Sequence, residues 1–228
     1  FGYVEAYKSL RTNLDFMAGS MDVHTLVITS TVPEESKSNV AVNLALTLAE
    51  SGKKVALVDC DLRKPVLHRY LKAGHNVKGV SNVLSNQCTL DETLQELKEM
   101  NLTFLPAGTP PPNPSEMLSQ PQMQAMVNTL REKFDVVIFD APPVSVVTDA
   151  AVIGRCVDGA MFVVRSDYAP ADAVRGAVKK LQDAGVRVLG SVLTRYDMKK
   201  ALKGSSYAYS YAYNYNYAYE NQKADVAE

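Results

Sequence analysis

The sequence predicts a doubly wound α/β domain built on a mostly parallel sheet, for three reasons. Six short apolar runs rich in Val, Ile, Leu and Phe have the length and composition of buried parallel strands. Segments between them repeat apolar residues with a helical period. Strands and helices that alternate in this way form units whose helices cover both faces of one sheet.

The predicted elements follow one another along the chain. A helix is expected over residues 3 to about 17, before the first strand. The helix after the first strand is predicted because Val40, Leu44 and Leu48 recur every four residues and share one apolar face. A Pro-rich loop over residues 106–114 leads into a further helix. The expected strands are residues 25–30, 54–59, 102–105, 136–140, 160–164 and 188–193.

Composition and charge limit the classes of function. Hydrophobic residues make up 46% of the 228-residue chain, which is enough for a sizeable core. The 24 Lys and Arg balance 25 Asp and Glu, so no basic excess indicates a nucleic-acid partner. Three scattered cysteines without metal-ligand spacing indicate reduced thiols in the cytoplasm. No apolar run is long enough to span a membrane, but the start at Phe1 leads us to expect a fragment that a membrane domain could precede.

The composition changes abruptly at Gly204, where a tail begins. Residues 204–228 combine small polar spacers with almost no aliphatic side chains, so we expect a flexible segment. An edge strand is the alternative, because tyrosine at every second position also fits a β period. The tail carries seven tyrosines: Tyr207, Tyr209, Tyr211, Tyr213, Tyr215, Tyr217 and Tyr219.

A phosphate-binding loop is predicted between the first strand and the following helix. The segment from Ser30 ends in Lys37-Ser38 at a helix N-terminus, where backbone N–H groups and the helix dipole favour anions. Lys37 would reach the terminal phosphates and Ser38 would hold Mg²⁺. Glu34 and Ser36 stand where glycines normally permit close approach of the backbone. An ordinary strand-to-helix turn is therefore the alternative.

Three aspartates end or follow two of the predicted strands. Asp59 and Asp61 lie two residues apart, so both project to the same side if the chain stays extended. Asp140 ends the fourth predicted strand. Acids at the carboxyl ends of buried strands suit Mg²⁺ ligation and activation of a hydroxyl nucleophile, although caps or salt bridges would explain any one of them. Nearby, Thr148-Asp149 is expected in a solvent-exposed loop, with support of the site as the alternative.

At this point the chain resembles the bacterial tyrosine kinases of capsular and exopolysaccharide synthesis, over nearly its whole length. The Lys37-Ser38 loop resembles Walker A, Val-Asp-Cys-Asp-Leu-Arg-Lys-Pro resembles Walker A′, and Val-Val-Ile-Phe-Asp-Ala-Pro-Pro resembles Walker B. A tyrosine cluster follows them in the family's order. The resemblance implies a P-loop kinase that uses ATP and Mg²⁺, with Asp59 as base for the tyrosine hydroxyl. Asp61 and Asp140 would arrange the metal ion and its waters.

The resemblance also implies three sets of site residues. Arg195 joins them because Thr-Arg-Tyr-Asp follows the last strand, where related P-loop proteins often place adenine contacts; a plain strand exit is the alternative. The expected nucleotide-binding residues are Glu35, Ser36, Lys37, Ser38, Asn39 and Arg195. The expected catalytic residues are Lys37, Asp59, Asp61 and Asp140, and the expected metal ligands are Ser38, Asp61 and Asp140.

The first predicted helix carries a charged face that bears on assembly. Glu5, Lys8 and Arg11 fall within an arc of about 120°, and a solvated surface is the simple interpretation. In the family, a Glu-x-x-Arg-x-x-Arg motif here packs against the neighbouring subunit. This chain matches it except for Lys8, which lacks the planar fork of arginine. The resemblance implies a ring-shaped, octamer-like homo-oligomer formed through residues 1–20.

The resemblance thus implies a kinase domain over residues 21–203 that phosphorylates tail tyrosines of neighbouring subunits and regulates polysaccharide synthesis and export. The resemblance implies a cytoplasmic location at the inner face of the plasma membrane. It also implies a transmembrane polysaccharide co-polymerase or activator, or a fused membrane domain, and a cognate tyrosine phosphatase.

Two alternative functions remain open from the sequence. One is a scaffold of the polysaccharide machinery that binds nucleotide poorly, which Glu34 and Ser36 favour. The other is a partition-type ATPase that acts as a dimer switch. The seven tail tyrosines favour a kinase over that switch, because the switch has no use for them.

Overall fold

The computed structural model describes residues 2–74 and 77–197. One compact unit, Phe1–Thr194, contains the sheet, and the chain from Arg195 to Glu228 forms a second unit. The first unit has the α/β architecture that the alternating pattern predicted, with all six predicted strands present.

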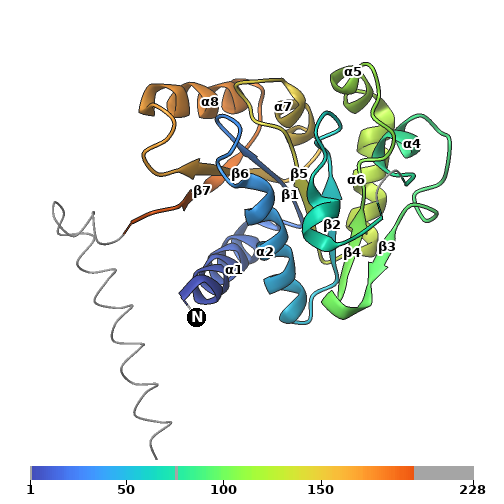
Figure 1. The fold of residues 1–228 in the computed structure, drawn as a ribbon, viewed down its shortest axis with the longest axis horizontal. Coiled ribbons are helices and arrows are strands. Elements are labelled where there is room, and N and C mark those ends of the chain that lie inside the picture. The colour runs from blue at the N-terminus through green and yellow to red at the C-terminus, as the bar shows by residue number, and fades with distance from the viewer. Residues whose placement is uncertain (1, 75–76, 198–228) are drawn as a thin grey trace, which may run out of the picture. The chain divides into compact units, whose positions relative to one another are not determined.

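A seven-stranded sheet forms the centre of the first unit, in the order β3-β4-β2-β5-β1-β6-β7 (Figure 1). Neighbouring strands are parallel except for β3 and β4, which are antiparallel. The strands are β1 Thr25–Ser30, β2 Val55–Asp59, β3 Gln95–Leu97, β4 Leu102–Leu105, β5 Val136–Asp140, β6 Gly159–Arg165 and β7 Val188–Thr194.

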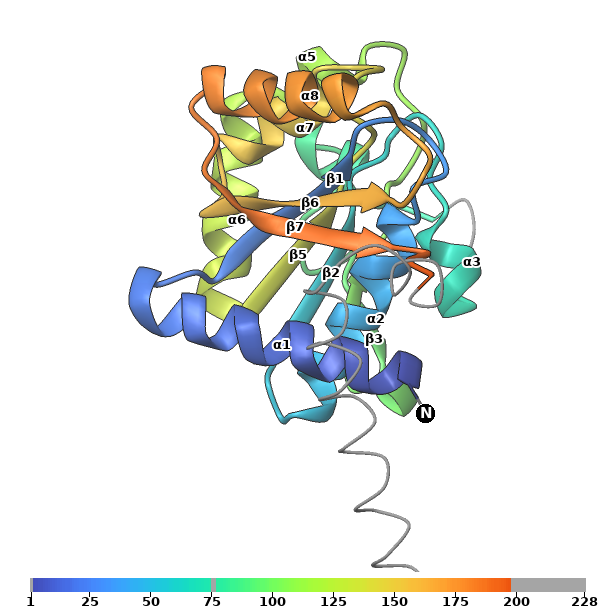
Figure 2. The ribbon, with the colours of Figure 1, turned by 90° about the vertical axis from the view of Figure 1, so that its left-hand side faces the viewer.

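Helices cover both faces of this sheet, and α1 runs along the same side as α2 (Figures 1 and 2). The first helix extends four residues beyond its predicted end, to Met21. The helices are α1 Gly2–Met21, α2 Lys37–Glu50, α3 Leu67–Leu71, α4 Val80–Leu84, α5 Pro114–Leu118, α6 Pro121–Lys133, α7 Asp149–Gly154 and α8 Ala171–Asp183, with a 3₁₀ helix η1 at Lys98–Met100.

Successive residues of the central strands supply two separate hydrophobic layers. In β1, Leu26 and Ile28 pack into the layer that also contains Leu44 of α2, whereas Val27 packs into the layer that contains Leu130 of α6. All five side chains are fully buried. This alternation follows from the two-residue period of a strand, and it fixes which side chains leave the sheet toward each layer.

The strand order brings the loops that follow β1, β5 and β2 to one edge of the sheet. β5 lies between β1 and β2, and Asp140 pairs in register with Ile28 on one side and Asp59 on the other. Ligands of doubly wound sheets bind at the carboxyl ends of the strands. The fold therefore places the phosphate-loop candidate beside the predicted acids.

Candidate active site

The phosphate-loop candidate leaves β1 at Ser30 and enters α2 at Lys37. Two of its residues have a left-handed backbone, Glu34 with φ of 67° and Ser36 with φ of 72°. These are the positions at which the sequence lacks the expected glycines, and a left-handed backbone costs a residue with a Cβ about 1–2 kcal/mol. The loop thus keeps a conformation that glycine would adopt more easily.

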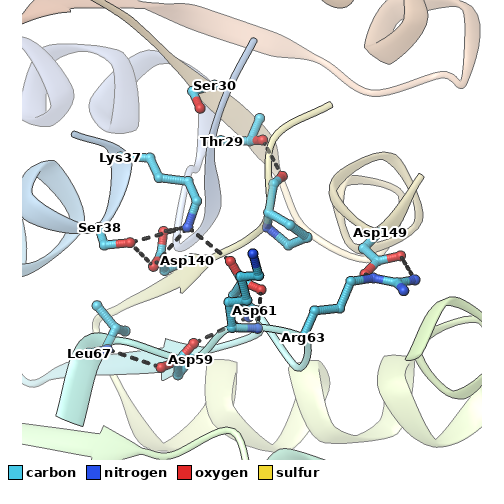
Figure 3. A network of polar contacts seen from close by, with 12 residues as sticks. Thr29, Ser30, Lys37, Ser38, Asp59, Asp61, Arg63, Leu67, Asp140 and Asp149 are labelled. Atoms are coloured by element: carbon cyan, nitrogen blue, oxygen red, sulfur yellow. Dashed lines mark hydrogen bonds and ion pairs between the residues drawn. The ribbon is translucent and has the colours of Figure 1, made fainter. Parts of the chain in front are cut away.

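Lys37 is the centre of a polar network at the carboxyl edge of the sheet (Figure 3). Its Nζ lies 3.3 Å from Asp61 Oδ2, 3.3 Å from Asp140 Oδ1 and 3.1 Å from Ser38 Oγ. Ser38 Oγ donates a hydrogen bond to Asp140 Oδ2 at 2.5 Å. The structure therefore brings together four of the predicted site residues, from the start of α2, the end of β5 and the loop after β2.

Asp59 lies at the same edge, where backbone groups hold its side chain (Figure 3). Its Oδ1 accepts from the Asp61 N–H at 3.2 Å, and its Oδ2 accepts from the Leu67 N–H at 3.2 Å. Asp61 Oδ1 accepts in turn from the Lys64 N–H at 3.0 Å. The segment after β2 thus folds around the two acids and fixes both carboxyl groups.

Burial and mutual repulsion change the proton affinities in this cluster. Burial raises the pKa of Asp59 to about 8, and the charge of Asp140 adds to the rise, while a backbone N–H and Lys37 oppose it. Burial also raises the pKa of Asp140, against the opposing effect of Lys37. For Lys37, burial lowers the pKa, but the three aspartates outweigh it and the net pKa is raised. One lysine faces three acids, so the cluster favours additional positive charge.

The donor atoms of this cluster fit a hard divalent cation. The Ser38 hydroxyl and the carboxyl groups of Asp61 and Asp140 are oxygen ligands of the kind that Mg²⁺ prefers. Within residues 2–74 and 77–197, no three Asp, Glu, His or Cys side chains form a group that could hold a metal ion. Two carboxylates and a hydroxyl still suit Mg²⁺, which usually keeps several waters and binds one or two carboxylates together with substrate phosphates.

Two residues predicted around the nucleotide direct their side chains into the protein. Glu35 is fully buried, and its carboxyl group accepts hydrogen bonds from the backbone. Asn39 Oδ1 accepts from the hydroxyl groups of Tyr3 and Tyr7 in α1, at 2.5 and 3.3 Å. A nucleotide contact through Glu35 would therefore use its backbone N–H, and the roles of both residues stay predictions.

A further buried acid, Asp149, lies at the same edge, and its partners were not predicted from the sequence. Asp149 begins α7 and is completely buried, so the expected solvent-exposed loop was wrong for this residue, whereas Thr148 before it is exposed as expected. Arg63 donates to its carboxyl group from Nε at 3.1 Å and from Nη2 at 3.4 Å, and Ser115 Oγ donates at 2.5 Å. These bonds tie the segment after β2 to α5 and α7, and Figure 3 shows the pair of Arg63 and Asp149. A Ser or Asp before a short helix gives too weak a signal to predict such a cluster.

The charged face of α1 makes contacts within its own subunit. Lys8 Nζ and Glu5 Oε1 form an exposed ion pair at 2.7 Å, a kind of pair that contributes about 0–1 kcal/mol. Arg11 donates to the carbonyl oxygen of Thr47, in the last turn of α2, at 3.0 Å. The subunit interface predicted through these residues stays a prediction.

Two further predictions concern residues beyond the sheet. Arg195 is the first residue of the second unit and has a left-handed backbone with φ of 52°, and its contact with adenine stays a prediction. The seven predicted phosphoacceptors, within residues 207–219, lie outside the described residues. Of the helices that the structure describes, none has both the length and the apolar character needed to cross a membrane.

Fold and site together define a P-loop-type nucleotide-binding domain. The defining features are a strand, a loop that ends in Lys-Ser at a helix N-terminus, and acids at the ends of neighbouring parallel strands. A family model described as an AAA domain matches residues 35–155. The MinD septum site-determining protein of Pyrococcus horikoshii, solved with Mg-ADP, shares the fold with a TM-score of 0.66 and 23% identity, over 76% of this chain and 70% of that chain.

More similar relatives identify the particular family. Tyrosine-protein kinase YwqD of Bacillus subtilis is 35% identical over 203 residues, which cover 89% of this chain and 84% of that protein. Tyrosine-protein kinase etk of Escherichia coli is 34% identical over 90% of this chain and 28% of its own length. The structure matches the kinase domain of E. coli ETK with a TM-score of 0.81, over 84% of this chain and 74% of that chain. The chain belongs to the bacterial tyrosine-protein kinase family, which confirms the predicted fold and class of enzyme.

Proposed function

We propose that the protein transfers the γ-phosphoryl group of ATP to the tyrosine cluster of its own tail, in trans within a homo-oligomer. The observation that carries this proposal is the meeting of Lys37, Ser38, Asp61 and Asp140 beside Asp59. Phosphoryl transfer needs positive charge at the phosphates, oxygen ligands for a metal ion and an acceptor for the hydroxyl proton. These five side chains supply all three, and the chain carries seven tail tyrosines as substrates.

Lys37 and the start of α2 would bind the phosphates. The Lys37 ammonium group stands at the helix N-terminus, where the free N–H groups and the helix dipole also attract anions. Its present partners, Asp61 and Asp140, hold it at the carboxyl edge of the sheet. Mg²⁺ bound by Ser38, Asp61 and Asp140 would neutralise charge on the phosphates.

Asp59 would accept the proton of the tyrosine hydroxyl. The tyrosine oxygen attacks the γ-phosphorus, the bond from that phosphorus to the leaving ADP oxygen breaks, and the hydroxyl proton passes to an Asp59 oxygen. A general base works best when its pKa lies near the working pH, and burial raises the pKa of Asp59 to about 8. Backbone bonds from Asp61 and Leu67 fix its two oxygens in place.

Family membership supports a wider role in capsular or exopolysaccharide synthesis and export. A transmembrane activator or a fused membrane domain, at the inner face of the plasma membrane, belongs to this proposal through the family resemblance. The chain spans 28% of the E. coli relative's length and 84% of the B. subtilis relative's length. A cognate phosphatase would reset the tail. We propose that subunits form the ring through Glu5, Lys8 and Arg11 of α1, because the side chains of Lys8 and Glu5 stay exposed, at 45% and 42%.

Intact mass spectrometry after incubation with ATP and Mg²⁺ tests this function. The protein should gain up to seven phosphates on its tail, and a variant with all seven tail tyrosines changed to Phe should gain none there. ADP release without any gain in mass would instead favour the ATPase switch.

A nucleotide-poor scaffold is the second candidate, and the left-handed backbones of Glu34 and Ser36 favour it. Calorimetric titration with ADP and Mg²⁺ separates the two candidates. A dissociation constant well below millimolar ADP supports the kinase, whereas the absence of binding at that concentration supports the scaffold.

A further inference from the structure

Glu35 is a buried acid in the phosphate loop that the proposed phosphoryl transfer does not use. Its side chain is fully buried, and both carboxyl oxygens accept hydrogen bonds from backbone amides. Oε2 accepts from the Val32 N–H at 2.8 Å, inside the same loop, and Oε1 accepts from the Arg165 N–H at 3.2 Å, at the end of β6. A carboxyl group is the only common side chain that offers two acceptor oxygens in this arrangement.

The backbone of Glu35 is held as well as its side chain. The Thr194 hydroxyl, at the end of β7, donates to the Glu35 carbonyl oxygen at 3.0 Å. One residue thus connects the phosphate loop to the ends of two neighbouring strands, β6 and β7. These strands belong to the central sheet, so they give the loop a rigid support.

Glu34 and Ser36, the neighbours of Glu35 on each side, have the left-handed backbones described above. Residues with a Cβ leave such conformations unless surrounding contacts hold them there. We propose that Glu35 is a positioning residue that holds the phosphate loop in its nucleotide-binding conformation although two of the usual glycines are missing. This inference rests on the proposed function only in that the loop must bind a nucleotide.

If Glu35 positions the loop, nucleotide affinity depends on Glu35 although its side chain does not touch the nucleotide. The apparent affinity falls in proportion to the fraction of molecules whose loop is in the binding conformation. Glu35→Gln keeps the size and shape of the side chain but replaces one acceptor oxygen with an NH₂ group, which then faces a backbone N–H. The loop loses a buried bond on one side, and the strained neighbours are free to relax.

Binding of ADP with Mg²⁺, measured by calorimetry, tests this in two backgrounds. In the natural loop, Glu35→Gln should weaken binding about tenfold or more. In a Glu34→Gly/Ser36→Gly background the same change should weaken it less than about threefold, because glycine adopts the left-handed conformation without help. Glu50→Gln is the matched control, since it makes the same change at an exposed position at the far end of α2, and it should leave binding unchanged.

Amide hydrogen exchange gives a readout that does not depend on bound nucleotide. Glu35→Gln should speed exchange at the N–H groups of Val32 and Arg165, while amides of α6 stay protected as evidence of an intact fold. If Glu35→Gln fails to fold, Thr194→Val provides a second test. It removes the hydroxyl bond to the Glu35 carbonyl at 3.0 Å and a longer one to the Val164 carbonyl at 3.5 Å, and it should speed exchange at the same amides by a several-fold smaller factor. If the natural protein fails to bind ADP, the proposed function is overturned. Amide hydrogen exchange at Val32 and Arg165 would still test whether Glu35 holds the loop in place.

Equal affinity of Glu35→Gln and the natural protein would overturn the inference. An equal loss of affinity in both backgrounds would also overturn it, because the effect would then be independent of the left-handed residues. A loss in the natural loop that the two glycines largely remove supports it.

Discussion

Two fully buried aspartates at the same edge of the sheet have opposite surroundings. Asp149 receives hydrogen bonds from Arg63 and Ser115, so its carboxyl group has a cation and a hydroxyl of its own. Asp140 shares one cation, Lys37, with Asp61. Its negative charge also repels the carboxylate of Asp59 and raises the pKa of that group. Figure 3 shows the Lys37 cluster and the pair of Arg63 and Asp149.

The difference separates a structural acid from a functional one. A buried charge with a full set of partners stabilises the native arrangement and has little left to offer a ligand. A buried cluster with more acids than cations carries raised pKa values and attracts a metal ion or accepts a proton. Changes in the two clusters should therefore affect different measurements.

Removal of Lys37 should produce the largest effect. Lys37→Ala deletes the cation that pairs with both Asp61 and Asp140 and the group predicted to face the phosphates, so tail phosphorylation should fall about 10³-fold or more. Initial rates of phosphate incorporation measure this, and circular dichroism checks that the fold is kept. A folded variant with a rate within tenfold of the natural protein would assign the chemistry to another site.

Asp59→Asn should come next. The amide cannot take up the tyrosine proton, so phosphoryl transfer should slow about 10²- to 10⁴-fold, while binding of ADP changes only a few-fold. Single-turnover kinetics together with calorimetry separate the two steps. If transfer and binding weaken by equal factors, Asp59 acts in nucleotide binding and the base must be sought elsewhere.

In the other cluster, Asp149→Ala should reduce stability. It leaves Arg63 and Ser115 without their shared acceptor, and the free energy of unfolding should fall by about 2–4 kcal/mol. Asp149→Asn is the milder control, because its amide oxygen can still accept. Urea denaturation measures the loss. A variant that keeps its stability but loses activity would place Asp149 among the functional acids and remove the contrast.

The smallest effect should appear in the pH dependence of stability without metal ions. The folded-state pKa of Asp59 is about 8, above the usual value near 4, so the folded state binds this proton more tightly than the unfolded state. The stability that the bound proton of Asp59 adds to the folded state is fully present below about pH 4, and it is lost as the pH rises through about 8. Asp59→Asn should therefore gain stability relative to the natural protein between pH 5 and pH 8, by on the order of 1–3 kcal/mol. Parallel stability curves would show that Asp59 is not strained by burial.

Local patterns predicted most of the fold, and the rest depended on contacts between distant segments. Six strands were predicted because they are apolar runs. The seventh, β3 at Gln95–Leu97, is a short polar segment at the edge of the sheet, and no periodic pattern in the sequence indicates it. The meeting of Asp59 and Asp140 followed from the rule for carboxyl ends of parallel strands. Arg63 and Asp149 are 86 residues apart, so their pairing could not be read from either motif.

The phosphate loop shows the same limit on a smaller scale. The missing glycines at Glu34 and Ser36 were visible in the sequence, but their left-handed backbones and the inward turn of Glu35 were not. A glutamate beside a phosphate site looks unfavourable until its burial against Val32 and Arg165 is known. The replacement of glycines by Glu34 and Ser36, which favoured a scaffold, is thus accompanied by hydrogen bonds from Val32 and Arg165 to Glu35 of the same loop.

A mixing experiment tests the central claim most directly. Lys37→Ala protein keeps its tail but should lack activity, and the variant with seven tail Phe residues should keep activity but lack acceptors. With ATP and Mg²⁺, intact mass spectrometry should find no tail phosphate on either variant alone and up to seven on Lys37→Ala after mixing. An unchanged Lys37→Ala mass in the mixture, although the natural protein alone gains phosphates, would contradict transfer between subunits.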